Sequence, residues 1–355
     1  MKIAILSSVN VKHMSLISLY TSLIDLSKHE LDVIYVDKFD IDEDIKNTKI
    51  FKYRIDINPN WGKLLKIKKY LNYRKYAKNI LTNTDYDLVI VWGTYTAYLF
   101  NDILLKKYKG KYIINVRDYF YDDIIPIKFI INKLVKNSIF TVLSSDGFLE
   151  FLPASNKYKV VHSKNEQIII NSEIRTNIKD TFPININFIG NIRFYDINQK
   201  IIELFKNDER VVLNYIGTGG ETLKKFVTEN RISNVKFVDG FNIEETSKYL
   251  NNTDVLLNAY GNNSKSLDTA LSIRLYYALF LKIPIIVSKE TYTGKIAKET
   301  GLGYELNFMD YDKESFIEWY RNLDYEKISS KISDQIDIIE KQNEEFEEVM
   351  KRILS

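Results

Sequence analysis

The sequence has no cysteine, which excludes disulfide bonds and thiolate metal sites and fits a reducing compartment such as the cytoplasm. Its three histidines are too few for a histidine-rich metal cluster, and its five prolines and 13 glycines are too few for long linkers or low-complexity tracts. The first residues lack the apolar segment and cleavage site of a signal peptide. No apolar run approaches the ~20 residues that cross a bilayer. We therefore expect a cytoplasmic globular protein.

Charge is distributed unevenly along a chain whose overall net charge is only +3. Residues 1–165 hold 26 basic and 17 acidic side chains, a net charge of +9, whereas residues 166–355 hold 24 and 30, a net charge of −6. The asymmetry indicates that the first half faces an acidic partner. An apolar content of 45% is typical of globular proteins, and a length of 355 residues suggests two domains.

Both halves alternate short apolar runs with segments of helical spacing, which is the pattern of a parallel sheet covered by helices on both faces. In the first half, residues 16–26 have helical spacing, and the predicted strands are residues 2–7, 31–36, 88–92, 111–116 and 138–143. In the second half, the predicted strands are residues 186–189, 211–216, 235–238, 254–258, 284–288 and 304–306.

These elements predict an α/β fold with two Rossmann-like, doubly wound parallel-sheet domains. The predicted parts are an N-terminal domain at residues 1–165, a linker at 166–183, a C-terminal domain at 184–332 and a closing helix at 333–355. Ligands of such sheets bind at the carboxyl ends of the strands, so we expect the site in a cleft between the two domains.

Three loops that follow predicted strands of the C-terminal domain have the residue types of an anion site. Residues 217–220, Gly-Thr-Gly-Gly, lead into a helix whose first N–H groups are free to bind a phosphate. Residues 190–193 are Gly-Asn-Ile-Arg, and Ser272 and Arg274 open an apolar helical segment. Each loop alone also fits an ordinary turn, with Ser272 as a helix cap and Arg274 as a solvated charge. Together, two cations and a helix start favour a diphosphate.

Five segments of the second half occur in a characteristic order. They are Phe-Ile-Gly-Asn-Ile-Arg at 188–193, Tyr-Ile-Gly-Thr-Gly-Gly at 215–220, Val-Lys-Phe-Val-Asp-Gly-Phe at 235–241, Thr-Asp-Val-Leu-Leu-Asn-Ala at 253–259 and Arg-Leu-Tyr-Tyr-Ala-Leu-Phe-Leu-Lys-Ile-Pro-Ile-Ile-Val at 274–287. This ordered set resembles the C-terminal domain of GT-B glycosyltransferases. It is most similar to the retaining, group 1-like branch that builds bacterial capsules, exopolysaccharides and O-antigens. The resemblance covers residues 186–306, and the first half is similar only in architecture.

The sequence departs from that family at one pair of positions. The last family segment usually contains two Glu seven residues apart, and the second of them binds the ribose of the nucleotide. The corresponding residues here are Thr269 and Tyr277. Some members from capsule loci have a Ser-x-Lys/Arg-x-Tyr-Tyr segment instead, and residues 272–277 look like it. A Tyr hydroxyl can donate to a ribose hydroxyl, but Tyr276 and Tyr277 equally fit the core.

The resemblance implies a nucleoside-diphosphate sugar as donor substrate and no further cofactor. Arg193, Arg274 and Ser272 would hold the diphosphate, and Phe241 would contact the base. In a retaining enzyme of this type the leaving diphosphate assists the attack, so the protein stabilises charge and needs no conventional base. The predicted donor-binding residues are Gly190, Asn191, Arg193, Gly217, Thr218, Gly219, Gly220, Phe241, Ser272, Arg274, Leu275, Tyr276 and Tyr277.

Polar residues after strands of the first half are candidates for the acceptor side. Arg117 and Asp118 could bind a sugar hydroxyl or form a local ion pair. His13 could orient or deprotonate an acceptor hydroxyl, although a lone His in a loop is more often solvated. These three are the predicted catalytic residues, and an inverting reaction would use His13 or Asp118 as its base. Weaker acceptor-side candidates are Asn10, Ser144 and His162.

Two Asp-x-Asp segments look like the metal motif of the other main glycosyltransferase fold. Asp85-Tyr-Asp87 precedes a predicted strand instead of ending one. Asp310-Tyr-Asp312 lies at a predicted helix start, where Asp caps N–H groups. We therefore expect no required metal.

Residues 61–81 contain seven cations and no acid, interspersed with aromatic and aliphatic side chains. This composition fits a helix at an anionic membrane surface, with contacts from Trp61, Lys66, Lys69 and Tyr73. It also fits an ordinary core helix with a solvated Lys-rich face and, less well, a nucleic-acid-binding helix.

The sequence thus predicts a retaining, metal-independent glycosyltransferase of the hexosyltransferase type. Its donor would be a nucleoside-diphosphate sugar such as a UDP-sugar. Its partners would be the nucleotide sugar, a surface-polysaccharide or lipid-linked glycan acceptor and the inner face of the membrane, but no nucleic acid. Two alternatives stay open. An inactive binding subunit of GT-B fold is supported by the missing Glu pair, and a sugar-nucleotide epimerase of the same fold would need several carboxylates in the cleft.

Overall fold

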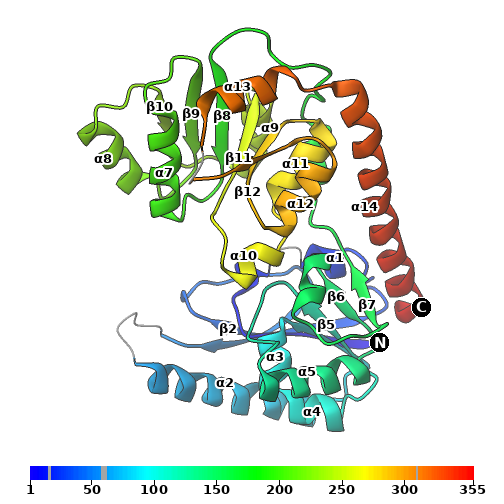
Figure 1. Cartoon of the computed structure of the whole chain (residues 1–355). Helices are drawn as coiled ribbons and strands as arrows, with labels where there is room; N and C mark the ends of the chain where they lie inside the picture. Colours follow the sequence, from blue (N-terminus) through cyan, green and yellow to red (C-terminus); the bar gives the residue numbers. More distant parts are fainter. Residues whose placement is uncertain (15–16, 57–61, 309–310) are drawn as a thin grey trace. The chain divides into compact units, whose positions relative to one another are not determined.

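The computed structural model describes residues 1–14, 17–56, 62–308 and 311–355. The chain divides into two compact units (Figure 1). Unit 1 consists of Met1–His162 and Lys341–Ser355, and unit 2 consists of Ser163–Glu340. The chain therefore crosses between the units twice, after His162 and after Glu340.

Within its described residues, unit 1 contains one parallel sheet of seven strands in the order β3-β2-β1-β4-β5-β6-β7. Five strands were predicted from the sequence; the two others, β3 and β7, are the edge strands. Edge strands were missed because their side chains are only partly buried and form no apolar run. The strands are β1 (Lys2–Ser7), β2 (Glu30–Asp37), β3 (Lys49–Arg54), β4 (Leu88–Trp92), β5 (Tyr112–Val116), β6 (Thr141–Leu143) and β7 (Tyr158–Val160).

Helices cover both faces of the unit 1 sheet. One face carries α2 (Lys63–Asn83), α3 (Thr94–Leu99), α4 (Asn101–Lys106) and α5 (Ile125–Asn137) (Figure 1). The other face carries α1 (Ser18–Thr21) and the end of α14 (Tyr325–Leu354), whose apolar side chains pack together over β1. The helix predicted at residues 16–26 is thus only one turn long. The hydroxyls of Thr21 and Ser22 donate to backbone carbonyls four residues earlier, a pattern that competes with helix propagation.

Unit 2 contains, within its described residues, a six-stranded parallel sheet in the order β10-β9-β8-β11-β12-β13. The strand order reverses between β8 and β11, so the loops after these two strands diverge and leave a crevice at the carboxyl edge of the sheet. All six predicted strands are present, with boundaries within two residues of the prediction. They are β8 (Ile184–Ile189), β9 (Val211–Ile216), β10 (Val235–Val238), β11 (Val255–Asn258), β12 (Ile285–Ser288) and β13 (Gly303–Leu306).

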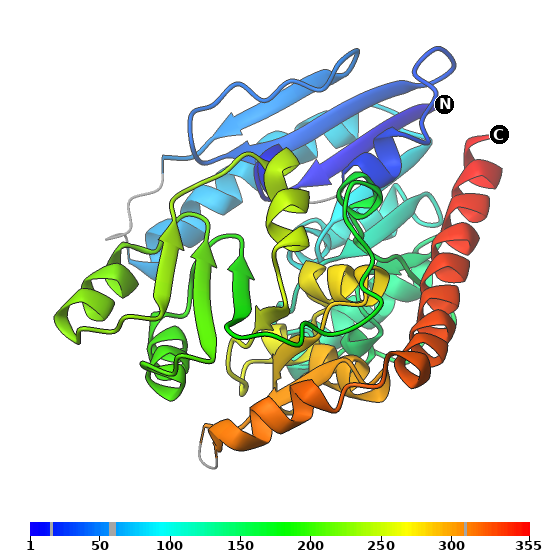
Figure 2. The same cartoon turned by 90° about the horizontal axis from the view of Figure 1, so that it is seen from above.

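Two apolar cores lie on opposite faces of the unit 2 sheet, and Figure 2 shows α7 (green) and α9 (yellow-green) on opposite sides of β8–β10. Phe188 belongs to one core and its neighbour Ile189 to the other, as alternation along a strand requires. The first face carries α7 (Tyr195–Phe205), α8 (Glu221–Glu229) and α13 (Lys313–Arg321). The second face carries α6 (Glu166–Ile170), α9 (Thr246–Asn251), α11 (Ile273–Leu281), α12 (Tyr292–Glu299) and the first part of α14.

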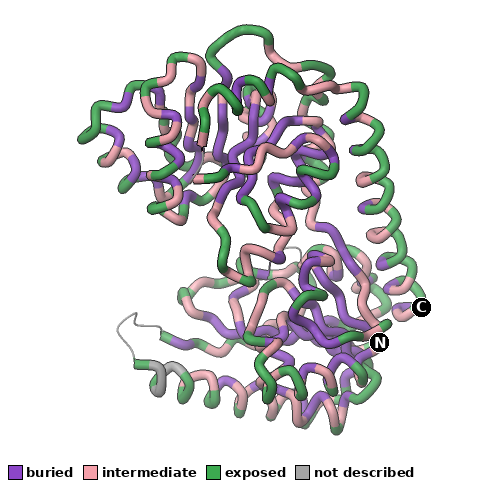
Figure 3. Tube along the Cα trace, in the orientation of Figure 1, coloured by how far each residue is buried: buried purple, intermediate pink, exposed green. Residues whose placement is uncertain are grey.

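The last helix begins earlier than the sequence pattern indicated. It starts at Tyr325, and the carboxylate of Asp324 accepts hydrogen bonds from the first N–H groups of the helix. Its buried residues Ile328 and Ile332 belong to unit 2, whereas Phe346 and Met350 belong to unit 1, and its outer side is exposed (Figure 3). No helix in the described part of the chain is both long and apolar enough to cross a membrane.

Candidate functional site

A buried guanidinium lies at the start of α11. Arg274 is the second residue of this helix and is only 5% exposed. Ser272 caps the helix, because its hydroxyl accepts a hydrogen bond from the backbone N–H of Arg274. The interpretation of Arg274 as a solvated charge is therefore wrong, whereas Ser272 does act as a cap.

The guanidinium is held by neutral groups. Its Nε and Nη2 donate to the carbonyl oxygen of Ile189 at the end of β8. Its Nη1 donates to the hydroxyl of Tyr260 and, at 3.5 Å, to Oδ1 of Asn258. The central carbon lies 4.0 Å from the ring centroid of Phe188, a cation–π distance. Among the described residues, no carboxylate forms an ion pair with Arg274.

The environment of Arg274 disfavours its positive charge. Burial lowers the pKa of its guanidinium to about 9; Tyr277 opposes this effect and Arg193 adds to it. A buried cation without a counter-charge is costly, because it has lost its hydration shell and gained only neutral hydrogen-bond acceptors. An anion that binds beside Arg274 would remove this cost, so Arg274 is a candidate anion-binding residue.

Glycines allow the loops after β8 and β9 to approach each other and Arg274. Gly217 has φ of +141°, and a Cβ atom there would lie 2.0 Å from the carbonyl oxygen of Gly190. Gly190 has φ of +128°, and a Cβ atom there would lie 3.0 Å from Nη2 of Arg274. Backbone hydrogen bonds join the loops, from Gly190 to Ile216 and from Ile192 to Thr218, each 2.8 Å long. Both backbone conformations favour glycine, so the glycines at positions 190 and 217 are explained by the close approach of the two loops.

Two cavities flank the start of α11, and Ile273 lines both of them. The first has a volume of about 310 Å³ and a mostly apolar wall, formed by Ile189, Gly190, Asn191, Gly217, Thr218, Gly240, Phe241, Ile243, Thr246, Ile273 and Tyr277. The second has a volume of about 260 Å³ and is lined by Arg193, Phe194, Asn258, Tyr260, Gly261, Leu267, Ala270, Leu271, Ser272, Ile273, Ser288, Thr291 and Thr293. Neither set of described lining residues contains an Asp or a Glu.

Hydroxyl groups from several elements meet in the second cavity. Ser288, at the end of β12, accepts hydrogen bonds from the backbone N–H groups of Tyr260 and Gly261. Thr293 accepts from the backbone N–H of Ser272 and donates to a carbonyl, and the Ser272 hydroxyl donates to Asn258. This network fixes the polar wall of the second cavity, whose described lining contains one cation, Arg193, and no acid. Arg274 is not among the lining residues of either cavity but donates to Asn258 and Tyr260 in this wall.

The structure separates the predicted donor-side residues into two groups. Gly190, Asn191, Gly217, Thr218, Phe241 and Tyr277 line the first cavity, and Arg193 and Ser272 line the second. Leu275 and Tyr276 are instead buried in the apolar core, and Gly219 and Gly220 line neither cavity. Thr269, at the first of the two family Glu positions, donates its hydroxyl to a carbonyl of its own short helix α10 (Lys265–Thr269).

Several lining residues were missed from the sequence. Asn258 and Ser288 are the last residues of β11 and β12, so their position at a strand end was the available signal. Thr291 and Thr293 belong to the start of α12, and Thr291 caps that helix. Tyr260 lies two residues after the end of β11, so it had the same signal, but its contact with Arg274 depends on the direction of the Arg274 side chain.

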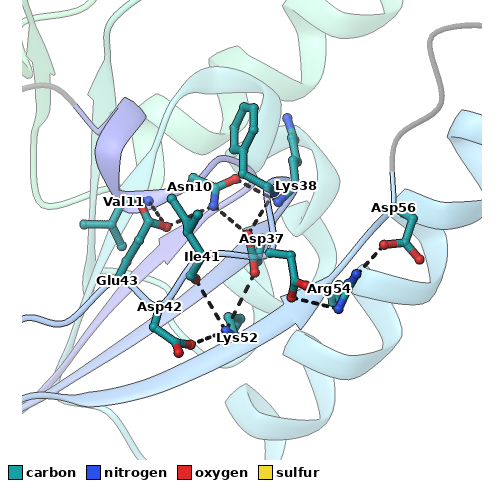
Figure 4. Close-up of polar contacts among 12 residues, drawn as sticks. Asn10, Val11, Asp37, Lys38, Ile41, Asp42, Glu43, Lys52, Arg54 and Asp56 are labelled. Carbon is teal, nitrogen blue, oxygen red and sulfur yellow. Dashed lines mark hydrogen bonds and ion pairs between the residues drawn. The ribbon is translucent and has the colours of Figure 1, made fainter.

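The predicted acceptor-side residue Asn10 is fully buried in unit 1. Its amide nitrogen donates to Asp37 and Glu43, each at 2.9 Å, and its oxygen accepts from the backbone N–H of Lys38 (Figure 4). Asn10 therefore holds the loop after β2 in place, which corrects the expectation of a direct acceptor contact. The neighbouring His13 is exposed, and its ring lies 5.2 Å from that of Phe39.

Other predicted acceptor-side residues are placed differently. Arg117 lies beyond the end of β5, with its guanidinium carbon 5.7 Å from the ring of Trp92, and the adjacent Asp118 is exposed. Ser144 is half-buried directly after β6. His162 is almost fully buried, and its ring contacts Gln342 of α14, so it anchors that helix in unit 1 and is not accessible to an acceptor.

The basic helix is α2, and its inner face belongs to the core. Tyr73 is fully buried, with its hydroxyl donating to the carbonyl of Ser7, so its predicted membrane contact is wrong. Lys69 is half-buried. Trp61 and the side chain of Lys66 lie outside the described residues.

The two Asp-x-Asp segments have structural partners. Asp85 pairs with Lys107 at 2.9 Å, and Asp87 accepts from the backbone N–H of Lys2. Asp312 caps α13, as predicted, and Asp310 lies outside the described residues. In the described part of the chain, no cluster of three or more His, Asp or Glu side chains is arranged to hold a metal ion.

No protein-family model and no curated protein matches the sequence. Solved structures match its fold over nearly the whole chain. Sucrose-phosphate synthase from Thermosynechococcus elongatus has a TM-score of 0.67 at 10% identity, covering 98% of this chain and 99% of that chain. The lipopolysaccharide outer core galactosyltransferase WaaB, in its apo form, has a TM-score of 0.64 at 16% identity, covering 99% and 100%.

A third similar structure is that of Anabaena HepE in complex with UDP and glucose. Its TM-score is 0.62 at 12% identity, covering 99% of each chain. Such likeness shows the fold alone. The chain has the GT-B fold of these glycosyltransferases, with two Rossmann-like parallel-sheet domains, and the fold class predicted from the sequence is confirmed.

Proposed function

We propose that the protein is a glycosyltransferase that uses a nucleoside-diphosphate sugar as donor. The observation that carries this proposal is the buried cation of Arg274, which has no acidic partner among the described residues. Its hydrogen-bond acceptors Ile189, Asn258 and Tyr260 line two cavities whose described linings contain no acid. The fold supports it, because the similar structures include glycosyltransferases and one was solved with UDP and glucose.

The two cavities fit the two ends of such a donor. The nucleoside would occupy the first cavity, where Phe241 offers an aromatic surface and Tyr277 a hydroxyl. The diphosphate would lie at the junction beside Ser272, where Arg193 and Arg274 neutralise its charge. The sugar would extend into the second cavity, whose volume of about 260 Å³ exceeds what a diphosphate fills.

The proposed reaction retains the anomeric configuration and requires no metal. As the bond from the sugar to the diphosphate breaks, negative charge grows on the leaving oxygen, and Arg193 and Arg274 would stabilise that charge. Arg117, Asp118 and His13 of unit 1 would bind and orient the acceptor hydroxyl. If the reaction inverts, His13 or Asp118 would act as the base, since both are exposed.

The proposed acceptor is a growing surface polysaccharide, such as a capsular glycan or exopolysaccharide, on a lipid carrier. This acceptor would explain the basic first half of the chain, because a lipid-linked glycan is presented at an anionic membrane. The protein would then work as a peripheral protein at the cytoplasmic face of the membrane, without nucleic-acid partners.

Two rival functions make different demands on the same site. An epimerase would need carboxylates to move protons, and neither cavity has one among its described lining residues. A binding subunit without turnover is favoured by one observation, the absence of both family Glu residues at Thr269 and Tyr277. It would bind the nucleotide sugar through Arg274 but would not consume it.

A thermal-unfolding panel tests the proposal. The protein would be heated with UDP, GDP, CMP, dTDP and their sugars, with and without Mg²⁺. A ligand at a hundredfold excess over Kd stabilises the native state by about 2.7 kcal/mol, so one nucleotide should raise the melting temperature clearly. Release of that nucleotide from its sugar in the presence of a membrane-extracted acceptor separates an enzyme from a binding subunit. No shift with any nucleotide would exclude the proposed donor site.

A further inference from the structure

Two large apolar side chains project outward from the first turns of α5. Ile125 is 84% exposed and Phe129 is 60% exposed, and their i, i+4 spacing places them on one face of the helix. The opposite face is in the core, where Leu134 is fully buried. The exposure is therefore a property of one helix face and does not arise from a loosely packed helix.

The same side of unit 1 exposes further apolar residues. We call them the outer apolar surface: Leu65, Ile67 and Leu71 of α2, Tyr121 and Ile124 before α5, and Ile125 and Phe129 of α5. Helix α4 packs against both α2 and α5, and all three cover the same face of the sheet (Figure 1). The exposed apolar residues before and at the start of α5 lie close together in the sequence, and an exposed apolar patch of this kind marks a binding surface.

Helices α2 and α5 carry only positive charges, whereas the loop before α5 carries three acids: Asp118 is exposed, Asp122 is buried, and Asp123 accepts a hydrogen bond from the Tyr119 hydroxyl at 2.7 Å. Helix α2 contains seven cations and α5 contains three, and neither helix contains an acid. The single acid of α4, Asp102, is paired with Arg74 and Lys78. On α5, Lys133 lies 4.4 Å from the ring of Phe129, and Lys136 is exposed one turn further along. Lysines flanking apolar side chains are the composition of an element that binds an anionic lipid surface.

We propose that residues 121–129 insert their apolar side chains into an anionic lipid bilayer, while lysines of α2 and α5 contact lipid phosphates. Helix α5 has 13 residues and is too short to cross a bilayer, so it would lie in the interface. The inference moves the main contact from α2, where Tyr73 is buried, to the start of α5. It builds on the proposed lipid-linked acceptor but can fail or succeed without it.

Vesicle flotation of the full chain tests the proposal. The vesicles would contain phosphatidylcholine alone or with phosphatidylglycerol. The wild-type protein should float with the anionic vesicles and bind the neutral vesicles weakly. The double variant Ile125→Ser/Phe129→Ser should bind the anionic vesicles about tenfold or more weakly, since each buried side chain contributes on the order of a tenfold change. The matched control is Ile170→Ser, because Ile170 of unit 2 is 75% exposed, and it should bind like the wild type.

A fluorescence measurement gives a second, residue-level result. Because the chain has no cysteine, Phe129→Cys can be labelled with an environment-sensitive fluorophore at one position. Its emission should shift to the blue with anionic vesicles, whereas labelled Ile170→Cys should not respond. Equal binding of the double variant and the wild type, equal binding to neutral and anionic vesicles, or no blue shift at position 129 would each overturn the proposal. Any of these three outcomes would indicate that the outer apolar surface binds a protein or a nucleic acid instead of lipid.

The two proposals can be told apart in the same protein. The double variant changes only exposed residues of unit 1, so its thermal response to the donor nucleotide should equal that of the wild type. A wild-type protein that binds anionic vesicles but no nucleotide would support the lipid surface and reject the donor site. A wild-type protein that responds to a nucleotide but does not bind anionic vesicles would support the donor site and reject the lipid surface.

Discussion

The Nε atom of Arg274 donates a hydrogen bond to the carbonyl oxygen of Ile189, 2.8 Å away. This contact joins the start of α11 to the end of β8, next to the point where the strand order of the unit 2 sheet reverses. It fixes a buried positive charge at the edge where doubly wound sheets bind their ligands. The position of this charge, more than any single motif, supports a diphosphate site.

The Gly190 and Gly217 loops should not tolerate side chains. In Gly217→Ala the new methyl group would lie 2.0 Å from the carbonyl oxygen of Gly190, so the loops must separate. We expect the free energy of unfolding to fall by about 1–3 kcal/mol or more. In Gly190→Ala the methyl group would press on Nη2 of Arg274 at 3.0 Å, and nucleotide affinity should fall. Urea unfolding and nucleotide titration measure the two effects.

Gly62 offers a matched control for these substitutions. Its φ is −60°, and a Cβ atom there would have no neighbour within 4 Å. Gly62→Ala should therefore leave both stability and nucleotide affinity close to those of the wild type. If Gly217→Ala were equally harmless, the close packing of the two loops would be disproved.

Donor binding should weaken in alkaline solution. Burial lowers the pKa of Arg274 to about 9, from an ordinary value of 12.5. The cost of burying its charge is therefore fully present below about pH 9 and decreases above it, as the folded state loses the proton before the unfolded chain does. Since the charged form binds the diphosphate, nucleotide affinity should be constant near neutral pH and fall as the pH rises through about 9. Calorimetric titrations across this range measure the effect, and an affinity that is constant through the transition would contradict it.

The hydroxyl of Tyr277 should contribute to nucleotide binding. Burial raises the pKa of this phenol to about 12, although Arg274 opposes the shift, so the group stays protonated and can donate to a ribose hydroxyl. Tyr277→Phe removes the hydroxyl and keeps the ring, so we expect Kd to rise about fivefold with little change in melting temperature. Tyr215→Phe, which alters a buried Tyr that lines neither cavity, should leave Kd unchanged. Equal Kd values for the wild type and Tyr277→Phe would assign Tyr277 to the core alone.

Asn10 should matter for the stability of unit 1. Burial alone would raise the pKa of Asp37, but hydrogen bonds from Asn10 and the Phe39 N–H, together with Lys52, outweigh it and lower that pKa. Asn10→Ala should reduce the free energy of unfolding by about 1–3 kcal/mol near neutral pH. The lowered pKa of Asp37 contributes stability that is fully present above its ordinary value of 3.8 and is lost as the pH falls through the lower folded-state pKa, so the loss should shrink in acid.

The exposed Asn72 of α2 provides the comparison for that substitution. Asn72→Ala should change the free energy of unfolding little at any pH. Similar losses for the two variants, or a loss for Asn10→Ala that does not depend on pH, would show that the hydrogen bonds to Asp37 contribute no stability.

The fold was predictable because central strands of both sheets, such as β4, β5 and β12, are buried along their whole length and appear in the sequence as apolar runs. The edge strand β3 alternates exposed and half-buried residues, so it has no such signal. Strand ends were equally visible, which is why Gly190 and Gly217 were found, whereas Ser272 was found as the polar residue before an apolar helix.

The direction of side chains was not predictable. Tyr276 and Tyr277 are adjacent in the sequence, yet only Tyr277 lines a cavity. Arg274 was expected to be either solvated or bound to an anion, and its burial between Phe188 and Tyr260 depends on residues far away in the chain. The same holds for Asn10 and His162, whose burial follows from partners 27 and 180 residues away.

The most direct test of the account is Arg274→Met, which keeps the length of the side chain and removes its charge. Replacing a buried charge that has no counter-charge by an apolar group of similar size removes a desolvation cost. The account predicts that the ligand-free variant melts at or above the wild-type temperature and no longer responds to the nucleoside diphosphate that stabilises the wild type. Arg321→Met, a change of an exposed Arg on α13, should keep the full response. A variant that loses stability but keeps its nucleotide response would show that Arg274 only holds the fold together, and would contradict the donor site.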